Sequence, residues 1–289
     1  MTTRVLVVDD YKSWQDFVCS MIEGEQGFQI VGRASDGLEA VQKASELQPD
    51  LILLDIGLPS LNGIEAALRI RQCAPKSRIL FVSENRDTDV ADAAIAAGAV
   101  GNVLKSHAAK ELLPVLNALR WSLAQNKPYL LGASRKIVYE EIVDAAAALM
   151  RSDYASMQVL YPERGTGGEL RLLAFRGFSP DAASSWEWVG ADSKCSCAIA
   201  LRKNRRVVAP DVATCDFMAD PEVQQIYLQI GVRACQSTPL ITRTARVVGM
   251  ISTLWREPHQ PSEDDFRLFD ILARETAELV ERCQGEDEK

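Results

Sequence analysis

The sequence predicts two domains: a five-stranded, doubly wound parallel α/β sheet, followed by an α+β domain with an antiparallel sheet. Three observations lead to this prediction. The chain has 289 residues, enough for two cores of about 130 to 150 residues each. Its first part alternates apolar runs with helical patterns. Its second part contains short strand patterns that follow one another through hairpin-length turns.

In the first part, five runs rich in Val, Ile and Leu predict strands that are buried on both faces. They are residues 4–8, 28–34, 51–54, 79–82 and 99–104. Segments with helical spacing follow the first four, at 14–24, 38–47, 63–73 and 89–98. Parallel strands need such crossover helices between them. The carboxyl ends of the strands border the ligand crevice of the sheet.

Polar side chains stand at the carboxyl ends of four of these strands. They are Asp9, Asp10, Asp55, Ser83 and Lys105. Each alone could be a helix cap, a turn residue or a surface charge. Together they fall on one edge of one sheet, so we expect them to converge on a small volume. Adjacent carboxylates repel each other unless a cation offsets their charge, which predicts a divalent-metal and phosphate site.

These segments resemble the receiver domain of bacterial two-component response regulators, a flavodoxin-like fold, over residues 3–124. The resemblance is carried by "VLVVDD", "LILLDIGLPSLNGIEA", "ILFVS" and "GAVGNVLKS". It implies that Asp55 accepts a phosphoryl group from a histidine kinase or phosphotransfer protein, and that Ser83 and Lys105 contact that group. The implied Mg²⁺ ligands are Asp9, Asp10, Asp55 and the carbonyl of Gly57.

Two residues depart from the receiver pattern. Asn102 stands where many receivers carry Tyr or Phe, three positions before the Lys. We therefore expect phosphorylation to be retained and its readout to be weakened or rerouted. Glu84 follows Ser83 where a small residue is common, and this extra carboxylate is expected to slow anionic phosphodonors or to favour one cognate kinase.

The second part begins after a Pro- and Gly-containing break at 125–133, which divides the chain into domains 1–124 and 134–289. Helical patterns occupy 134–150, 195–204, 221–231 and 262–283, and the last begins with a Ser cap. Strand patterns occupy 155–161, 170–177, 206–212, 234–241 and 246–255. The helices beside the break form either a signalling connector or parts of their own domains, and the sequence leaves both open.

Residues 134–283 resemble a GAF domain, in particular the GAF modules of bacterial sensor kinases. The matching segments include "CSCAIALRKNRRVVAPDV", "GVRACQSTPLITR" and "VVGMISTLWREPHQPSEDD". Such domains bind varied small molecules or none, and a cyclic nucleotide or a bilin is disfavoured because their motifs are missing. The candidate ligand-site residues, each with a core or surface role as its alternative, are Trp186, Trp188, Cys195, Cys197, Asp211 and Gln236.

Cysteine usage leaves three alternatives in this domain. The chain has seven Cys, an odd number, and we expect reduced thiols. Cys195, Cys197, Cys215 and Cys235 could hold zinc or an iron–sulfur cluster, but only one close pair is present. Thiol redox chemistry is the second alternative, and buried inert cysteines are the default. His107 and His259 lie outside any metal-ligand spacing.

Charge and hydropathy limit the partners. The net charge is −8, which disfavours direct nucleic-acid binding, and the basic segment 202–206 fits a solvated turn. No apolar run reaches membrane-spanning length, so a cytoplasmic protein is expected. The leading hypothesis is a response regulator that signals through its GAF domain or a homodimer and has no separate catalytic domain. The alternatives are a small-molecule, metal or redox sensor tuned by the receiver, and a scaffold with a vestigial receiver.

Overall fold

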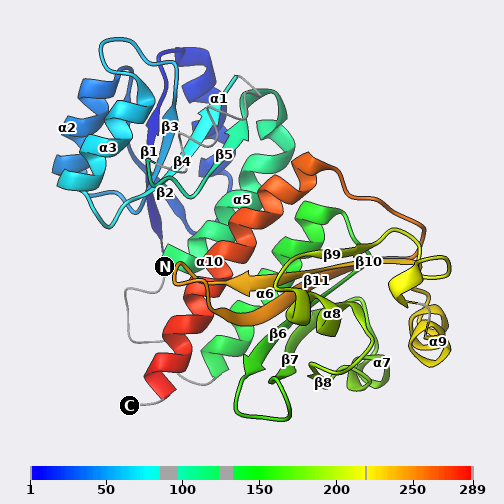
Figure 1. The fold of residues 1–289 in the computed structure, drawn as a ribbon. Coiled ribbons are helices and arrows are strands. Elements are labelled where there is room, and N and C mark those ends of the chain that lie inside the picture. Colours follow the sequence, from blue (N-terminus) through cyan, green and yellow to red (C-terminus); the bar gives the residue numbers. More distant parts are fainter. Residues whose placement is uncertain (1, 85–96, 124–132, 219, 288–289) are drawn as a thin grey trace. The chain divides into compact units, whose positions relative to one another are not determined.

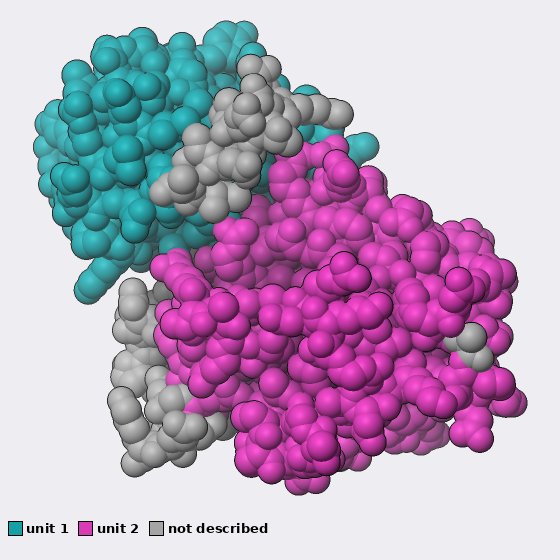
Figure 2. Space-filling model, viewed as in Figure 1, with its two compact units in different colours: residues 1–126 teal, residues 127–289 magenta. Residues whose placement is uncertain are grey.

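The computed structural model describes residues 2–84, 97–123, 133–218 and 220–287 (Figure 1). The chain divides into two compact units, residues 1–126 and 127–289 (Figure 2). Nearly all of the expected break at 125–133 and of the expected helix at 89–98 lies outside the described residues. The domain boundaries at 124 and 134 therefore stay a prediction.

The first unit contains the predicted five-stranded parallel sheet, with strand order β2-β1-β3-β4-β5. Its strands are β1 (Thr3–Val8), β2 (Phe28–Ala34), β3 (Leu51–Asp55), β4 (Arg78–Ser83) and β5 (Gly101–Leu104). Its described helices are α1 (Lys12–Glu23), α2 (Gly37–Leu47), α3 (Gly63–Cys73), the 3₁₀ turn η1 (Lys105–His107) and α5 (Ala108–Leu123). The last strand is two residues shorter than predicted, and the other four agree closely with the apolar runs.

Local sequence features place the helices against the sheet. Asp36 caps α2 by accepting hydrogen bonds from the backbone N–H of Leu38 and Glu39, and Asn62 caps α3 in the same way. Gly63, the first residue of α3, lies so close to β3 that a Cβ atom there would be 2.0 Å from the carbonyl oxygen of Asp55. Only glycine allows this approach, which fixes the chain beside the end of β3.

The second unit contains the predicted antiparallel sheet, with six strands in the order β8-β7-β6-β11-β10-β9. Its strands are β6 (Tyr154–Tyr161), β7 (Glu169–Arg176), β8 (Trp188–Gly190), β9 (Val207–Ala209), β10 (Ala234–Ile241) and β11 (Val247–Trp255). Its described helices are α6 (Ala133–Met150), α7 (Pro180–Ser184), α8 (Ser196–Lys203), η3 (Asp216–Met218), α9 (Pro221–Gln229) and α10 (Glu263–Asp287). The short elements α7 and β8 were not predicted, because three to five residues are too few to show a period.

The two faces of this sheet pack against different helices. Helices α6 and α10 contact each other and the central strands, whereas α8 contacts β9, β10 and β11 (Figure 1). Successive residues of a strand point to opposite faces, so the side chains of β10 divide between these two environments. Among the described residues, no helix combines the length and the apolar character that a membrane crossing requires.

Candidate functional site

Three carboxylates meet at the carboxyl edge of the parallel sheet. One ligand atom from each of Asp9, Asp10 and Asp55 lies within 4.8 Å of the others, and in the part of the chain that the structure describes no second such group of acidic, His or Cys side chains occurs. Asp9 and Asp55 are buried and Asp10 is exposed, so the group opens to solvent on one side. Hard oxygen donors at this spacing fit Mg²⁺ or a similar divalent cation.

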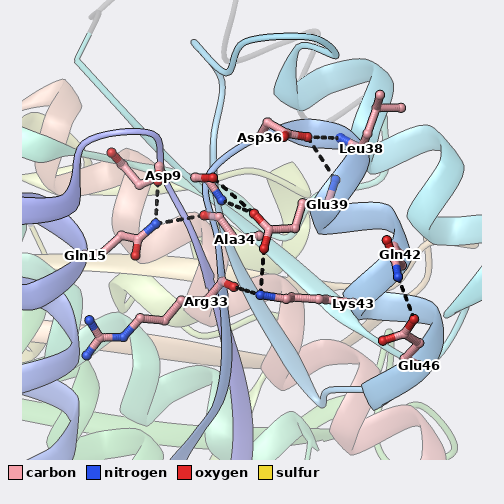
Figure 3. A network of polar contacts seen from close by, with 11 residues as sticks. Asp9, Gln15, Arg33, Ala34, Asp36, Leu38, Glu39, Gln42, Lys43 and Glu46 are labelled. Atoms are coloured by element: carbon pink, nitrogen blue, oxygen red, sulfur yellow. Dashed lines mark hydrogen bonds and ion pairs between the residues drawn. The ribbon is translucent and has the colours of Figure 1, made fainter.

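The backbone around Asp9 is fixed by hydrogen bonds to β2. Asp9 donates its N–H to the carbonyl of Ala34, and the buried side-chain amide of Gln15 donates to the carbonyls of both residues, at 2.5 and 2.8 Å (Figure 3). Asp9 Oδ1 accepts a hydrogen bond from the N–H of Tyr11. Gln15 is not among the predicted site residues, because a buried glutamine on a helix carries no motif.

Asp55 ends β3, and the backbone of the next residue holds one of its carboxylate oxygens. Its Oδ1 accepts a hydrogen bond from the N–H of Ile56 at 2.8 Å, which leaves Oδ2 facing the group. Gly57 lies beside it, since a Cβ atom at Gly57 would be 3.8 Å from Asp55 Oδ2. The structure thus brings the three expected carboxylate ligands together and places Gly57 next to Asp55.

Lys105 supplies positive charge to this group. Its Nζ lies 2.6 Å from Asp9 Oδ2 and 3.1 Å from Asp55 Oδ2, and it also lies 5.7 Å from the ring centre of Trp14. Burial raises the pKa of Asp9, and hydrogen bonds from Lys105 and Tyr11 offset only part of that effect. Burial lowers the pKa of Lys105, but its contacts with the two carboxylates outweigh this and raise it above its ordinary value.

Ser83 and Asn102 lie side by side on neighbouring strands. The Ser83 hydroxyl donates to Asn102 Oδ1 at 3.2 Å, and both residues are buried. The neighbouring Glu84 is exposed. Asn102 therefore does more than replace an aromatic ring, because its amide oxygen engages the hydroxyl of β4.

The six candidate residues of the second unit do not gather at one place. A partly enclosed cavity with about 20 Å³ of free space lies between the sheet and α8, and Trp186 and Cys197 line it. Other lining residues, which the sequence analysis missed, are Ser156, Gln158, Phe178, Ser196, Tyr227 and Ser252. They come from β6, β11, α8, α9 and the segment between β7 and α7, so no local sequence pattern identifies them.

The remaining four candidates lie elsewhere. Cys195 is the residue before α8, and Trp188 packs under the guanidinium of Arg164. Asp211 forms an ion pair with Arg233, and Gln236 bonds to Thr253 and Thr238 on the face opposite the cavity.

The cysteines considered as metal ligands do not converge. Cys195, Cys197 and Cys235 are buried in one apolar cluster and Cys215 packs against its edge, yet they do not form a metal-binding group within the described part of the chain. No disulfide links them. The geometry therefore gives no support to a four-thiolate zinc or iron–sulfur site.

Comparison with known proteins accounts for both units. A family model for the response regulator receiver domain matches residues 5–117, and a model for the GAF domain matches residues 132–281. A Pseudomonas aeruginosa protein named as a transcriptional regulator is 33% identical over 158 residues, which are 55% of this chain and 74% of that protein.

Two further matches cover one unit or about half of the chain. A protein-glutamate methylesterase/protein-glutamine glutaminase of Thermotoga maritima is 43% identical over 106 residues, which are 36% of this chain and 30% of that protein. This chain thus spans less than a third of its length. A solved domain of a Sinorhizobium meliloti protein described as a two-component sensor histidine kinase is 21% identical, with a TM-score of 0.43, and the match covers 54% of this chain and 97% of that domain.

The acidic group with its lysine and the two family matches point to the same conclusion. The chain belongs to the response regulators, with a receiver domain at residues 5–117 followed by a GAF domain at residues 132–281.

Proposed function

We propose that Asp55 is the phosphoacceptor of this response regulator and that a histidine kinase or a phosphotransfer protein is the donor. The observation that supports this most directly is the position of Asp55 Oδ2, 3.1 Å from Lys105 Nζ and beside Asp9 and Asp10. A carboxylate attacks a negatively charged phosphoryl group only when nearby positive charge offsets the repulsion. Lys105 supplies one such charge.

The donor set fits a magnesium ion held by Asp9, Asp10, Asp55 and the Gly57 carbonyl, and the ion supplies further positive charge when it is bound. In the transfer, Asp55 Oδ2 forms a bond to phosphorus while the bond from phosphorus to the donor nitrogen breaks. The donor imidazole keeps the electron pair and takes a proton from solvent. In this proposal Lys105 contacts the phosphoryl oxygens from its position beside Asp55, and the Ser83 hydroxyl, which donates to Asn102 Oδ1 in the structure, turns to contact them.

A labelling experiment tests this assignment. The full chain is incubated with a small phosphodonor and Mg²⁺, and its intact mass is measured. Wild type should gain one phosphoryl group and Asp55→Ala none. Asp50→Asn is a matched control, because Asp50 flanks the opposite end of β3, where it accepts a hydrogen bond from the backbone of Arg4. Equal labelling of Asp55→Ala and wild type would sink the proposal.

We further propose that the output is protein association through the GAF domain or a second copy of this chain, without direct DNA contact. The net charge of −8 supports this, because a phosphate backbone would be repelled. A DNA-binding assay at low salt tests the absence of DNA contact. Measurement of the molecular mass in solution before and after phosphorylation tests association with a second copy. An unchanged molecular mass, with no partner protein captured, would contradict output through association.

The alternative is a GAF domain that serves as the input of the protein. The cavity beside α8 is the observation that favours this alternative.

A further inference from the structure

The cavity of the GAF domain carries a sulfur atom in an unusual polar setting. Cys197 lines the cavity, and its Sγ lies 3.5 Å from the Ser237 hydroxyl and 3.4 Å from the Ser252 hydroxyl. These hydroxyls belong to a buried chain that continues through Ser196 to Tyr227, with oxygen separations of 2.9, 2.8 and 3.2 Å. Two hydroxyl groups that are able to donate hydrogen bonds therefore contact one thiol.

Cys235 shows how unusual this environment is. Both thiols are buried in the same apolar cluster. Burial raises the pKa of Cys235 to about 12. The pKa of Cys197 falls below its ordinary value instead, because hydrogen bonds from Cys195 and then from Ser237 and Ser252 outweigh burial. The second position of α8 also places Cys197 where the helix dipole favours negative charge.

A second thiol stands next to the first. Cys195 is the residue that precedes α8, and the hydrogen bond between the two thiols raises the pKa of Cys195 well above its ordinary value, with burial adding to the effect. Cys197 lines the cavity and contacts two hydroxyls, whereas Cys195 is not among the residues that line it. This is the division expected of an attacking and a resolving cysteine.

The cavity itself selects a small ligand that donates a hydrogen bond. Its free space of about 20 Å³ holds roughly one water-sized molecule. Gln158 lines it and is 2% exposed, and its Oε1 has no hydrogen-bond partner among the described residues, although its Nε2 donates to the carbonyl of Trp186. A buried amide oxygen of this kind favours an incoming O–H group.

We propose that Cys197 is an oxidisable thiol that reacts with hydrogen peroxide in this cavity and that Cys195 resolves the product to a disulfide. The Cys197 thiolate attacks one peroxide oxygen, the S–O bond forms as the O–O bond breaks, and hydroxide leaves. Sulfur is oxidised by two electrons and the peroxide is reduced. The Cys195 thiol then attacks the sulfenic sulfur, the S–S bond forms, and the hydroxyl group departs with the Cys195 proton as water.

The test compares the rates of oxidation of individual cysteines in the reduced full-length protein. Wild type treated with hydrogen peroxide should lose two hydrogens, and peptide mapping should place the disulfide between Cys195 and Cys197. Dithiothreitol should reverse it. In Cys195→Ser, a sulfenic acid should accumulate at Cys197 and appear as a gain of one oxygen atom in the intact mass, and it should react with dimedone when the protein is unfolded in the presence of that reagent. Cys235→Ser is the matched control and should behave as wild type. We expect Cys197 to react at least about tenfold faster than Cys235.

Three results would each overturn the proposal. They are oxidation of Cys197 no faster than that of Cys235, oxidation only after denaturation, and an equal rate with bulky cumene hydroperoxide. A thermal unfolding midpoint shows whether Cys195→Ser folds. If it does not fold, the comparison of the Cys197 and Cys235 oxidation rates in wild type still tests the proposal. Because the readout is sulfur oxidation, its outcome is separate from that of Asp55 labelling.

Discussion

Removal of the Lys105 charge should strengthen Mg²⁺ binding while it slows phosphorylation. Lys105 Nζ is 2.6 and 3.1 Å from two carboxylate oxygens of the acidic group. Magnesium binds oxygen ligands at about 2.1 Å, so an ion held by the same carboxylates would lie roughly 4 to 5 Å from Nζ. Lysine and metal therefore repel each other and compete for the same oxygens.

The size of this repulsion follows from the distance. A charge of +1 and a charge of +2 separated by about 4.5 Å repel by about 2 kcal/mol at the dielectric constant of water. The value for water sets a lower bound, because Asp9, Asp55 and Lys105 are largely buried and Asp10 is exposed, so the effective dielectric constant is lower than that of water. We therefore expect Lys105→Met to bind Mg²⁺ at least about twentyfold more tightly than wild type. Transfer to Asp55 should nevertheless become slower, because the lysine no longer offsets the charge of the incoming phosphoryl group.

Calorimetric titration with Mg²⁺ at low salt measures the first effect, and mass labelling with a small phosphodonor measures the second. Lys43→Met is the matched control, since it removes the same charge from an ion pair with Glu39 on α2. If Lys105→Met bound Mg²⁺ no better than this control, the lysine would not be competing with the metal, and the geometric argument would be refuted.

Three further substitutions test polar contacts that stabilise the two units. Gln15→Leu should destabilise the receiver by about 1 to 3 kcal/mol in urea unfolding, because the Asp9 carbonyl loses the buried Gln15 donor and the Ala34 carbonyl keeps only the N–H of Asp9. Ser262→Ala should cost about 1 kcal/mol, because the Ser262 hydroxyl accepts from the N–H of Asp265 at the start of α10. Burial raises the pKa of Asp265, but hydrogen bonds from Ser262 and the charge of Arg151 outweigh this and lower it. Its stabilising contribution is therefore present at neutral pH and lost as the pH falls through the folded-state pKa, so Asp265→Asn should be less stable than wild type at pH 7 and equal to it in acid.

The receiver site could be predicted from sequence because its residues sit at fixed places in a regular sheet. The carboxyl ends of parallel strands share one edge, so Asp9, Asp55 and Lys105 had to meet once the strands were assigned. The residues that hold the site in place could not be predicted in the same way. Gln15 donates hydrogen bonds to the carbonyl of Ala34 on β2 and to that of Asp9, which follows β1. The hydrogen bond from Ser83 to Asn102 depends on side-chain rotamers.

The residues around the GAF cavity could not be identified from the sequence alone. Ser237 and Gln236 are neighbours on β10, yet the Ser237 hydroxyl contacts Ser196 and Cys197 of α8, whereas Gln236 bonds to Thr238 and Thr253 on the opposite face. The alternation itself is visible in the sequence, but the face that borders the cavity depends on pairing with β11 and on the packing of α8. Cys197 and Cys235 differ for the same reason. Both are buried in one apolar cluster, and of the two only Cys197 contacts hydroxyls from two paired strands, so its polar surroundings depend on strand register and cannot be seen in the neighbouring sequence.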